Sequence, residues 1–438
     1  MKVHDVAIKK MAFGGSGVGH IDGKVCFVPY TAPGDTVRVK IVAEKRSYLT
    51  GEMVELLEPS PDRVTPPCPV FGLCGGCNWQ HMSSQAQSNA KQEIYTELLW
   101  RFGRIESNRI DPIVTAPESY GYRARMQFKV QLKAGRLHLG FYRFGSHQVI
   151  DVPQTCAIAS PSVNRVFAVL RSFISGCPEP EKIPQIDVTV GDDESAAVVF
   201  HYTGNRHRDV SAYVKRQEAI EGMAVFLRYG RNQILSRISG NENLCYHVPR
   251  LLLQSRQDTV LSFTPGGFSQ VNYKQNLTLV STVSEWAELT GSERVLDLFC
   301  GNGNFSIPLA RSAAEIVGIE EYPPSVLDAV RNCELNEVVN ASFRSVDALA
   351  GLHDLVAAGK RFETVILDPP RSGAVDLVRH IPALHAEKIV YISCDPATLA
   401  RDIGILGERG YAVTRTQPVD MFPQTYHLES ITLLERMM

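Results

Sequence analysis

The sequence has no long hydrophobic run, and no apolar segment approaches the roughly 18 to 20 residues needed to span a bilayer. Its first residues also lack the apolar stretch of a signal peptide. We therefore expect a cytoplasmic protein with no membrane contact. Neither sign of charge is in large excess, since 45 Lys and Arg residues stand against 47 Asp and Glu residues. This balance hides a basic stretch over residues 101–150, which has nine basic and three acidic residues.

Internal repeats and low-complexity segments are also absent, and nothing implies an obligate protein partner. The length of 438 residues predicts about two or three domains. Short alternating runs separated by glycine turns predict a small β-barrel over residues 1–62. Residues 63–262 read as a central α+β domain with a largely antiparallel sheet over residues 120–260. Alternating strands and helices over residues 263–438 predict a doubly wound α/β domain.

A glycine loop follows the strand predicted at residues 294–299. It contains Gly301 and Gly303 but lacks the third glycine of Gly-x-Gly-x-x-Gly, so a cofactor without phosphate fits it better than a pyrophosphate. Glu320 ends the next strand, where a carboxylate can accept both ribose hydroxyls, and Asp347 ends the third and can accept from an adenine amino group. Together these features indicate S-adenosylmethionine. The alternative is that each acid is a solvated residue at a strand end.

Three cysteines, Cys68, Cys74 and Cys77, lie close together, with glycines that let the chain fold tightly around a metal centre. Cys156 is the obvious fourth ligand, since four thiolates are the usual shell of a 4Fe–4S cluster. Zinc usually takes paired Cys-x2-Cys motifs, so the spacing favours iron–sulfur. The Cys-x3-Cys-x2-Cys triad of radical enzymes is absent, which argues against radical chemistry. The alternative is a group of unpaired buried thiols.

Cys394 follows an apolar strand directly, in the sequence Ser393-Cys394-Asp395-Pro396. A thiol at a strand tip beside a cofactor loop suggests covalent catalysis, because a thiolate is intrinsically nucleophilic. A buried structural cysteine would explain the position equally well. Four other cysteines have no motif around them and are expected to be packing residues: Cys26, Cys177, Cys245 and Cys333.

Basic and aromatic residues interleave in the stretch that begins at residue 101. The basic members are Arg101, Arg104, Arg109, Arg123, Arg125, Lys129, Lys133, Arg136 and Arg143, and the aromatic members are Phe102, Tyr120, Tyr122, Phe128, Phe141, Tyr142 and Phe144. This composition suits phosphate contacts and base stacking on RNA. A sheet with a charged outer face and an aromatic inner face would have the same composition.

Five motifs taken together closely resemble those of the RNA uracil-5-methyltransferase family. They are Cys68-x5-Cys74-Gly-Gly-Cys77, Asp297-x-Phe299-Cys-Gly-x-Gly-Asn304, Leu367-Asp368-Pro-Pro-Arg371, Ser393-Cys394-Asp-Pro and His427-x-Glu429. The match runs from about residue 3 to the C-terminus, and the N-terminal part resembles the TRAM domain, an OB-like RNA-binding barrel. That domain together with the cysteine cluster is similar to the ribosomal-RNA branch rather than the transfer-RNA branch.

The resemblance implies a Rossmann-like methyltransferase domain and a role for each matched residue. Cys394 is the implied nucleophile and Glu429 the implied proton acceptor. The implied cofactor contacts are Gln270, Phe299, Asn304, Glu320, Asp347 and Asp368, and the implied cluster ligands are Cys68, Cys74, Cys77 and Cys156. His427 is expected to be structural, since one acid suffices as the base.

The implied reaction is S-adenosylmethionine-dependent methylation of uridine C5 in RNA, with 23S ribosomal RNA as the expected substrate. Uracil C5 is a weak nucleophile, so Cys394 would first add to C6, and Glu429 would later remove the C5 proton. The target base would be flipped out of its stack. Three alternatives stay open: a methyltransferase for transfer-RNA uridine, one for RNA cytosine, and a non-catalytic iron–sulfur RNA-binding protein.

Overall fold

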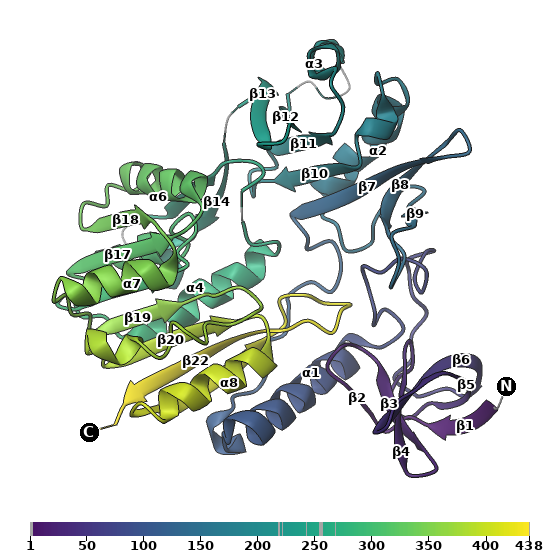
Figure 1. Ribbon diagram of the computed structural model, residues 1–438, viewed down its shortest axis with the longest axis horizontal. Helices are drawn as coiled ribbons and strands as arrows, with labels where there is room; N and C mark the ends of the chain where they lie inside the picture. The colour runs from purple at the N-terminus through teal and green to yellow at the C-terminus, as the bar shows by residue number, and fades with distance from the viewer. Residues whose placement is uncertain are drawn as a thin grey trace.

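The computed structural model describes residues 3–217, 220, 222–241, 243–253, 257–267 and 269–437. Within them the strands form a six-stranded N-terminal sheet, a seven-stranded central sheet, a two-stranded ribbon and a seven-stranded C-terminal sheet. Figure 1 shows the N-terminal sheet at the lower right, the central sheet above it and the C-terminal α/β domain on the left. No helix of the described part is long and apolar enough to cross a bilayer.

The N-terminal sheet wraps around a small apolar core. Its strands are β1 (Val3–Ala7), β2 (Lys10–Met11), β3 (Gly17–Ile21), β4 (Lys24–Val28), β5 (Thr36–Glu44) and β6 (Tyr48–Glu58), in the order β1-β5-β6-β4-β3-β2. Alternate residues of β5, such as Val37 and Val39, are buried in the core, as the period of two requires. A Cβ at Gly51 would lie 2.1 Å from Val39 Cγ1, so glycine permits the close approach of β6 to β5.

Helix α1 (Ser84–Leu98) follows the N-terminal sheet in the chain and contacts both that sheet and the C-terminal domain. Ser83 caps it by accepting a hydrogen bond from the backbone N–H of Ala86 at 3.2 Å. The sequence predicts one helix over residues 84–102, but the chain changes to a π-helical turn, η1 (Leu99–Gly103), at its end. Leu99 packs there into the core of the C-terminal domain, and α1 lies beside α8 (Pro396–Gly407) (Figure 1).

The central sheet has the order β13-β12-β11-β10-β7-β8-β9 and is antiparallel except for the pair β11·β12. Its elements are η2 (Ser107–Arg109), β7 (Arg125–Lys133), β8 (Arg136–Tyr142), β9 (Val149–Asp151), α2 (Pro161–Ser175), η3 (Pro180–Lys182), β10 (Gln185–Val190), β11 (Ala196–Tyr202), α3 (His207–Val214), β12 (Ala224–Tyr229) and β13 (Ile234–Ser239). Helix α2 covers one face, where Phe167 stacks on Phe128 with 4.4 Å between ring centroids.

Two strands expected in the central sheet form a separate ribbon instead. Strands β14 (Leu244–Val248) and β15 (Thr259–Phe263) pair only with each other among the described strands, and η5 (Arg250–Leu253) lies between them. Leu244 and Tyr246 pack into the same apolar cluster as Val295 of the C-terminal sheet. The ribbon thus bridges the central and C-terminal domains.

The C-terminal domain is the predicted doubly wound fold. Its elements are α4 (Tyr273–Ala287), β16 (Arg294–Leu298), α5 (Ser306–Leu309), η6 (Ala310–Ser312), β17 (Glu315–Glu320), α6 (Pro323–Leu335), β18 (Ala341–Ser345), α7 (Ala348–Ala357), β19 (Thr364–Leu367), η7 (Ile381–Leu384), β20 (Lys388–Ser393), α8, β21 (Tyr411–Val419) and β22 (Glu429–Arg436). The strand order is β18-β17-β16-β19-β20-β22-β21, and β22 alone runs opposite to the other strands.

One helix of this domain is shorter than predicted. The sequence predicts a helix over residues 305–314, but only α5 is α-helical and the chain then tightens into the 3₁₀ turn η6. Every residue of α5 is buried, so packing rather than an amphipathic pattern determines this segment. The strand order reverses between β16 and β19, and a ligand crevice is expected at the carboxyl ends of these strands.

Candidate functional site

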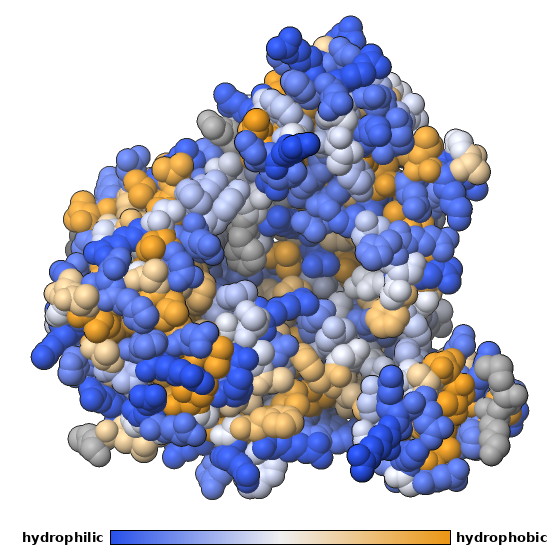
Figure 2. All heavy atoms as spheres, in the orientation of Figure 1, coloured by the Kyte–Doolittle hydropathy of each residue, from blue (hydrophilic) through white to orange (hydrophobic). Residues whose placement is uncertain are grey.

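A cavity of about 650 Å³ lies at the carboxyl ends of the C-terminal strands. The face of the molecule in Figure 2 is hollowed where the three domains meet, and the strand ends face this hollow. The cavity is lined by Ser269, Gln270, Val271, Phe299, Gly301, Glu320, Glu321, Tyr322, Ser325, Asp347, Ala348, Asp368, Pro369, Pro370, Arg371, Cys394, Phe422 and Glu429. The structure therefore brings every residue expected to contact the cofactor or to catalyse, except Asn304, to one cavity.

The loop after β16 presents its backbone to the cavity. Phe299, Gly301 and Gly303 have φ angles of 66°, 55° and 84°, which form a tight left-handed turn. A Cβ at Gly301 would meet no atom within 4 Å, so this stretch of backbone is open to a ligand. The Gly301 N–H donates to a carboxylate oxygen of Glu320 at 3.2 Å, which fixes the loop against the end of β17.

Glu320 ends β17 as predicted, whereas Asp347 follows the last residue of β18 by two positions, and each acid also has a structural partner. Glu320 accepts a second hydrogen bond, from the N–H of Tyr322 at 2.8 Å. Asp347 caps α7 by accepting from the N–H of Ala350 at 3.0 Å. Carboxylate oxygens have two lone pairs each, so both side chains retain acceptor capacity toward the cavity.

Asn304 lies below the loop in an adjoining pocket that Gln270, Phe299 and Asp368 also line. Its side-chain oxygen accepts from the Tyr246 hydroxyl at 2.9 Å and from Asn276 Nδ2 at 2.8 Å. Its own Nδ2 donates to Asn276 Oδ1 at 2.9 Å. This buried network uses most of the hydrogen-bonding capacity of the amide, so Asn304 holds the loop in place from beneath.

Cys394 and Glu429 come together because of strand register. Ser393 ends β20 directly opposite Ser430 of the antiparallel strand β22. Cys394, which follows Ser393, and Glu429, which precedes Ser430, are therefore neighbours. Burial and the negative charges of Glu429 and Asp368 raise the pKa of the Cys394 thiol to about 12, and Arg371 opposes this. Glu429 is 6% exposed, and its pKa is raised first by burial and then by Asp368.

The cavity is strongly acidic. Its lining includes five carboxylates, Glu320, Glu321, Asp347, Asp368 and Glu429, and one basic side chain, Arg371. Burial, with the charges of Asp297 and Glu320, raises the pKa of Asp368 to about 7. Asp297 lies on β16 below the loop with one carboxylate oxygen buried and unpartnered, and its pKa is also raised, to about 7, by burial. Such a site favours a cationic ligand.

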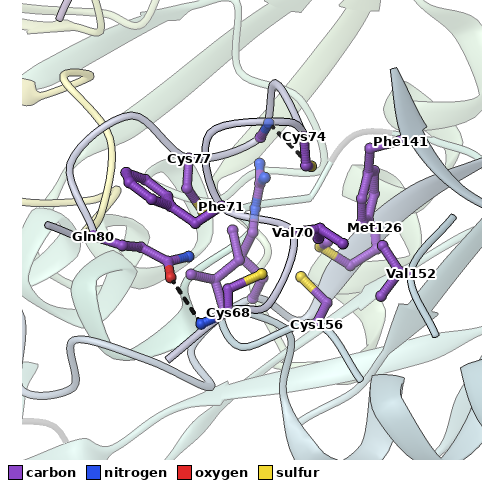
Figure 3. A pocket seen from close by; sticks show the side chains of 13 residues that line it. Cys68, Val70, Phe71, Cys74, Cys77, Gln80, Met126, Phe141, Val152 and Cys156 are labelled. Atoms are coloured by element: carbon purple, nitrogen blue, oxygen red, sulfur yellow. Dashed lines mark hydrogen bonds between the residues drawn. The ribbon is translucent and has the colours of Figure 1, made fainter. Parts of the chain in front are cut away.

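The four predicted cluster ligands line a second cavity, of about 50 Å³. Figure 3 shows the sulfurs of Cys68 and Cys156 facing one another, with apolar side chains such as Val70 and Met126 around them. All four thiols are free. Burial raises the pKa of Cys74 to about 11 and that of Cys77 to about 12, and each is raised further by the other thiolates.

The spacing of these sulfurs bears on the kind of metal centre that they could hold. No three of Cys68, Cys74, Cys77 and Cys156 have sulfurs that all lie within 4.8 Å of one another. Tetrahedral zinc with Zn–S bonds of about 2.3 Å holds its sulfurs about 3.8 Å apart. A four-iron cluster is wider than one ion and holds its four thiolates further apart. The four cysteines thus line one cavity without forming a compact three-sulfur group.

The basic and aromatic stretch of residues 101–144 does not form one surface. Phe128 is fully buried in the central core, and Tyr122 is 6% exposed with its hydroxyl bonded to the carbonyl of Pro423 at 2.9 Å. Arg109 donates to the carbonyl of Thr414 in the C-terminal domain, whereas Arg143 lies just after β8. The sequence places these residues near one another, but the fold divides them between two domains and the core.

The sequence points to no role for two residues that contribute here, Arg371 of the cavity and Tyr246 of the adjoining pocket. Arg371 is the last residue of the Leu367-Asp368-Pro-Pro-Arg371 motif and the one basic residue of the cavity lining. Its place in that motif could have marked it as a residue of the site. Tyr246 reaches Asn304 from β14, and no sequence pattern marks it.

Comparison with known proteins places these sites in a family. The family model described as "tRNA (Uracil-5-)-methyltransferase" matches residues 84–437, and the TRAM domain model matches residues 2–54. The 23S rRNA (uracil(1939)-C(5))-methyltransferase RlmD of Alcanivorax borkumensis is 34% identical over 98% of this chain and 96% of its own. The RlmD of Methylococcus capsulatus is 35% identical over the same shares.

A solved structure is similar over almost the whole chain. The Pyrococcus abyssi tRNA (uracil-54, C5)-methyltransferase in complex with S-adenosyl-L-homocysteine is 26% identical, with a TM-score of 0.75. The similarity covers 98% of this chain and 100% of that one. The chain therefore belongs to the RNA uracil-5-methyltransferase family and carries a TRAM domain at its N-terminal end.

Proposed function

We propose that this protein methylates C5 of a uridine in 23S ribosomal RNA, with Cys394 as nucleophile and Glu429 as proton acceptor. The observation that carries the chemistry is the meeting of these two side chains at one acidic cavity. The choice of RNA is supported by full-length relatives that are named for uracil 1939 of 23S rRNA. A ribosomal-RNA substrate supports a cytoplasmic location for the protein.

The cavity suits S-adenosylmethionine, whose sulfonium and amino groups are cationic. We assign its contacts to six side chains of this cavity and of the pocket that adjoins it: Gln270, Phe299, Asn304, Glu320, Asp347 and Asp368. The open backbone at Gly301 leaves room for a nucleoside, and the carboxylates are acceptors for hydroxyl and amino groups. When bound, the cofactor supplies the electrophilic methyl group that uracil C5 accepts.

The protein residues supply the covalent steps. Cys394 releases its thiol proton to solvent, and the thiolate sulfur forms a bond to uracil C6, which opens the C5–C6 double bond and makes C5 nucleophilic. After C5 is methylated, Glu429 removes the C5 proton, the double bond forms again and the C6–sulfur bond breaks. The carboxyl group must be ionised to act as a base, and Arg371 favours that form.

Arg371 also acts on the nucleophile. Its positive charge lowers the pKa of Cys394, against the larger effects of burial and of the neighbouring carboxylates. A thiolate is the reactive form of cysteine, so this charge increases the fraction of enzyme that can attack. We assign Arg371 the role of stabilising the thiolate.

We further propose that Cys68, Cys74, Cys77 and Cys156 hold a 4Fe–4S cluster. This proposal is supported by four free thiols around one small apolar cavity and by sulfur spacings wider than one ion requires. Four cysteine ligands leave no iron open for substrate, so the cluster is not the site of methyl transfer. Protein purified without oxygen should contain about four iron atoms per chain and show a visible charge-transfer band, and Cys156→Ala should lose both.

Trapping with 5-fluorouridine tests the nucleophile. Fluorine at C5 cannot leave as a proton, so the wild type with S-adenosylmethionine should remain covalently attached to a substituted 23S rRNA fragment. Cys394→Ser should give no adduct, and Cys333→Ser, at a cysteine outside both cavities, should trap as well as the wild type. Failure of the wild type to form an adduct, or equal trapping by Cys394→Ser, would refute the proposed mechanism.

Substrate choice needs its own comparison, because the similar solved structure is named for tRNA uracil 54. Methyl incorporation should be measured on a 23S rRNA fragment, on a transfer RNA, and on each RNA with the target uridine replaced by cytidine. We expect incorporation only in the 23S fragment that retains the uridine. Methylation of the transfer RNA alone would overturn the assignment of ribosomal RNA.

A further inference from the structure

Three metal-binding side chains meet at the junction of the central and C-terminal domains, outside both cavities described above. Asp192 lies in the turn between β10 and β11, and Cys245 and His247 lie on one face of β14, two residues apart. One ligand atom from each of the three lies within 4.8 Å of the other two. The sequence predicts that Cys245 is a packing residue, but its thiol is only partly buried and contacts a carboxylate oxygen of Asp193.

The contacts among these groups and the adjacent Asp193 are close to the ligand spacings of a tetrahedral metal site. His247 Nδ1 lies 2.9 Å from Asp192 Oδ1, and Cys245 Sγ lies 3.8 Å from Oδ2 of the adjacent Asp193. Around tetrahedral zinc, nitrogen and oxygen ligands stand about 3.3 Å apart, and sulfur and oxygen ligands about 3.5 Å apart. At these distances the groups contact one another directly. Small movements of the side chains would place the same atoms around a metal ion.

We propose that Asp192, Cys245 and His247 bind a zinc ion, with Asp193 or water in the fourth position. Zinc accepts sulfur, nitrogen and oxygen ligands together, whereas magnesium and calcium prefer oxygen alone. On binding, the Cys245 thiol releases its proton to solvent and the thiolate takes its place on the metal. The side chains of Asp192 and His247 are 28% and 41% exposed, so an ion can enter from solvent.

The position of the site indicates what the ion would do. Tyr246 lies between the two β14 ligands and points to the opposite face, where its hydroxyl bonds Asn304 below the cofactor loop. The turn that carries Asp192 is already joined to β14, because the Asp192 N–H donates to the carbonyl of Cys245 at 3.2 Å. The metal would therefore fasten the central sheet to the strand that supports the cofactor loop.

Zinc titration against a chromophoric chelator tests the proposal, with full-length protein that carries its iron–sulfur cluster. The wild type should bind one more Zn²⁺ than Cys245→Ala. The substitution Asp192→Asn should lower the affinity for that ion at least about tenfold. Zinc should also slow alkylation of Cys245, measured by mass spectrometry of its peptide. Cys333→Ala, at another half-buried thiol, is the matched control and should bind as many ions as the wild type.

The alternative is an ion pair of His247 with Asp192 and no metal. In that case the wild type, Cys245→Ala and Cys333→Ala would bind the same amount of zinc, and zinc would not protect Cys245 from alkylation. Melting curves without zinc should show that all variants fold. Should Cys245→Ala fail to fold, two other measurements decide the question. The zinc site is refuted if Asp192→Asn binds zinc as tightly as the wild type and if zinc does not change the alkylation rate of Cys245 in the wild type.

Discussion

The backbone N–H of Asn78 donates to the carbonyl oxygen of Gln424 at 3.0 Å, one residue after the last cysteine of the 68–77 loop. The N–H of Trp79 donates to the same oxygen at 3.1 Å. Gln424 lies in the connection between β21 and β22, and Phe422 and Glu429 of the active-site cavity lie at either side of it. The cysteine loop is thus bonded directly to one wall of the cavity.

Loss of the proposed iron–sulfur cluster should loosen this wall. Without the cluster the cysteine loop loses its central constraint, and the hydrogen bonds to Gln424 weaken with it. We expect hydrogen–deuterium exchange over residues 78–79 and 420–428 to rise at least about tenfold after iron chelation, while β16 and β19 stay protected. Cys333→Ser, which retains the cluster, should exchange like the wild type. Equal protection with and without the cluster would mean that the wall is held by other contacts.

Removal of the proposed base should trap the natural substrate. In Glu429→Gln the Cys394–uracil bond can form, but the C5 proton has no acceptor, so the adduct cannot resolve. We expect product formation to fall at least about 100-fold and an adduct to accumulate on unmodified RNA, visible as a shifted band on a denaturing gel.

The matched control for that experiment is Glu321→Gln, because Glu321 lines the same cavity but has no assigned role. It should retain activity within about threefold and accumulate no adduct. If Glu429→Gln instead turned over normally, or Glu321→Gln accumulated the adduct, the proton acceptor would have to be reassigned.

The free enzyme should hold Cys394 as a thiol at neutral pH. Its pKa is raised to about 12, so the thiolate fraction, and with it the alkylation rate by iodoacetamide, should rise about tenfold per pH unit above neutrality. Arg371→Gln removes the charge that lowers this pKa and should slow alkylation at every pH below 12. Arg361→Gln, an exposed site outside the cavity, should change nothing. A rate that levels off near pH 7 would contradict the raised pKa.

The buried pair Lys91–Asp420 should contribute strongly to stability. Lys91 has a fully buried side chain, lies 2.5 Å from Asp420 and also donates to the carbonyl of Phe422 at 3.0 Å. Lys91→Met leaves a buried carboxylate without its partner, which should lower the free energy of unfolding by about 3–5 kcal/mol in urea. Lys24→Met breaks an exposed pair with Glu44 and should leave the free energy of unfolding close to that of the wild type. If both variants lost a similar amount of unfolding free energy, the buried pair would not be more stabilising than the exposed one.

The order of the domains and the doubly wound fold could be predicted because their signals are local. Alternation of strands and helices, the Gly301 loop and the strand ends at Glu320 and Asp368 can each be recognised in a few consecutive residues. The length of α5 depends on its burial on all sides, which no local sequence pattern indicates. The predicted helix over residues 305–314 was therefore too long.

The sequence by itself determined which side chains can do the chemistry: one thiol at a strand tip, one acid at a strand start, and a group of four cysteines. Tertiary structure alone decided which of them meet. Antiparallel register joins Cys394 to Glu429, a tyrosine of β14 supports Asn304, and the stretch that looked like one basic surface is divided between two domains and the core. The reason is that these contacts join residues far apart in the chain, and their partners become neighbours only when the sheets and the core have formed.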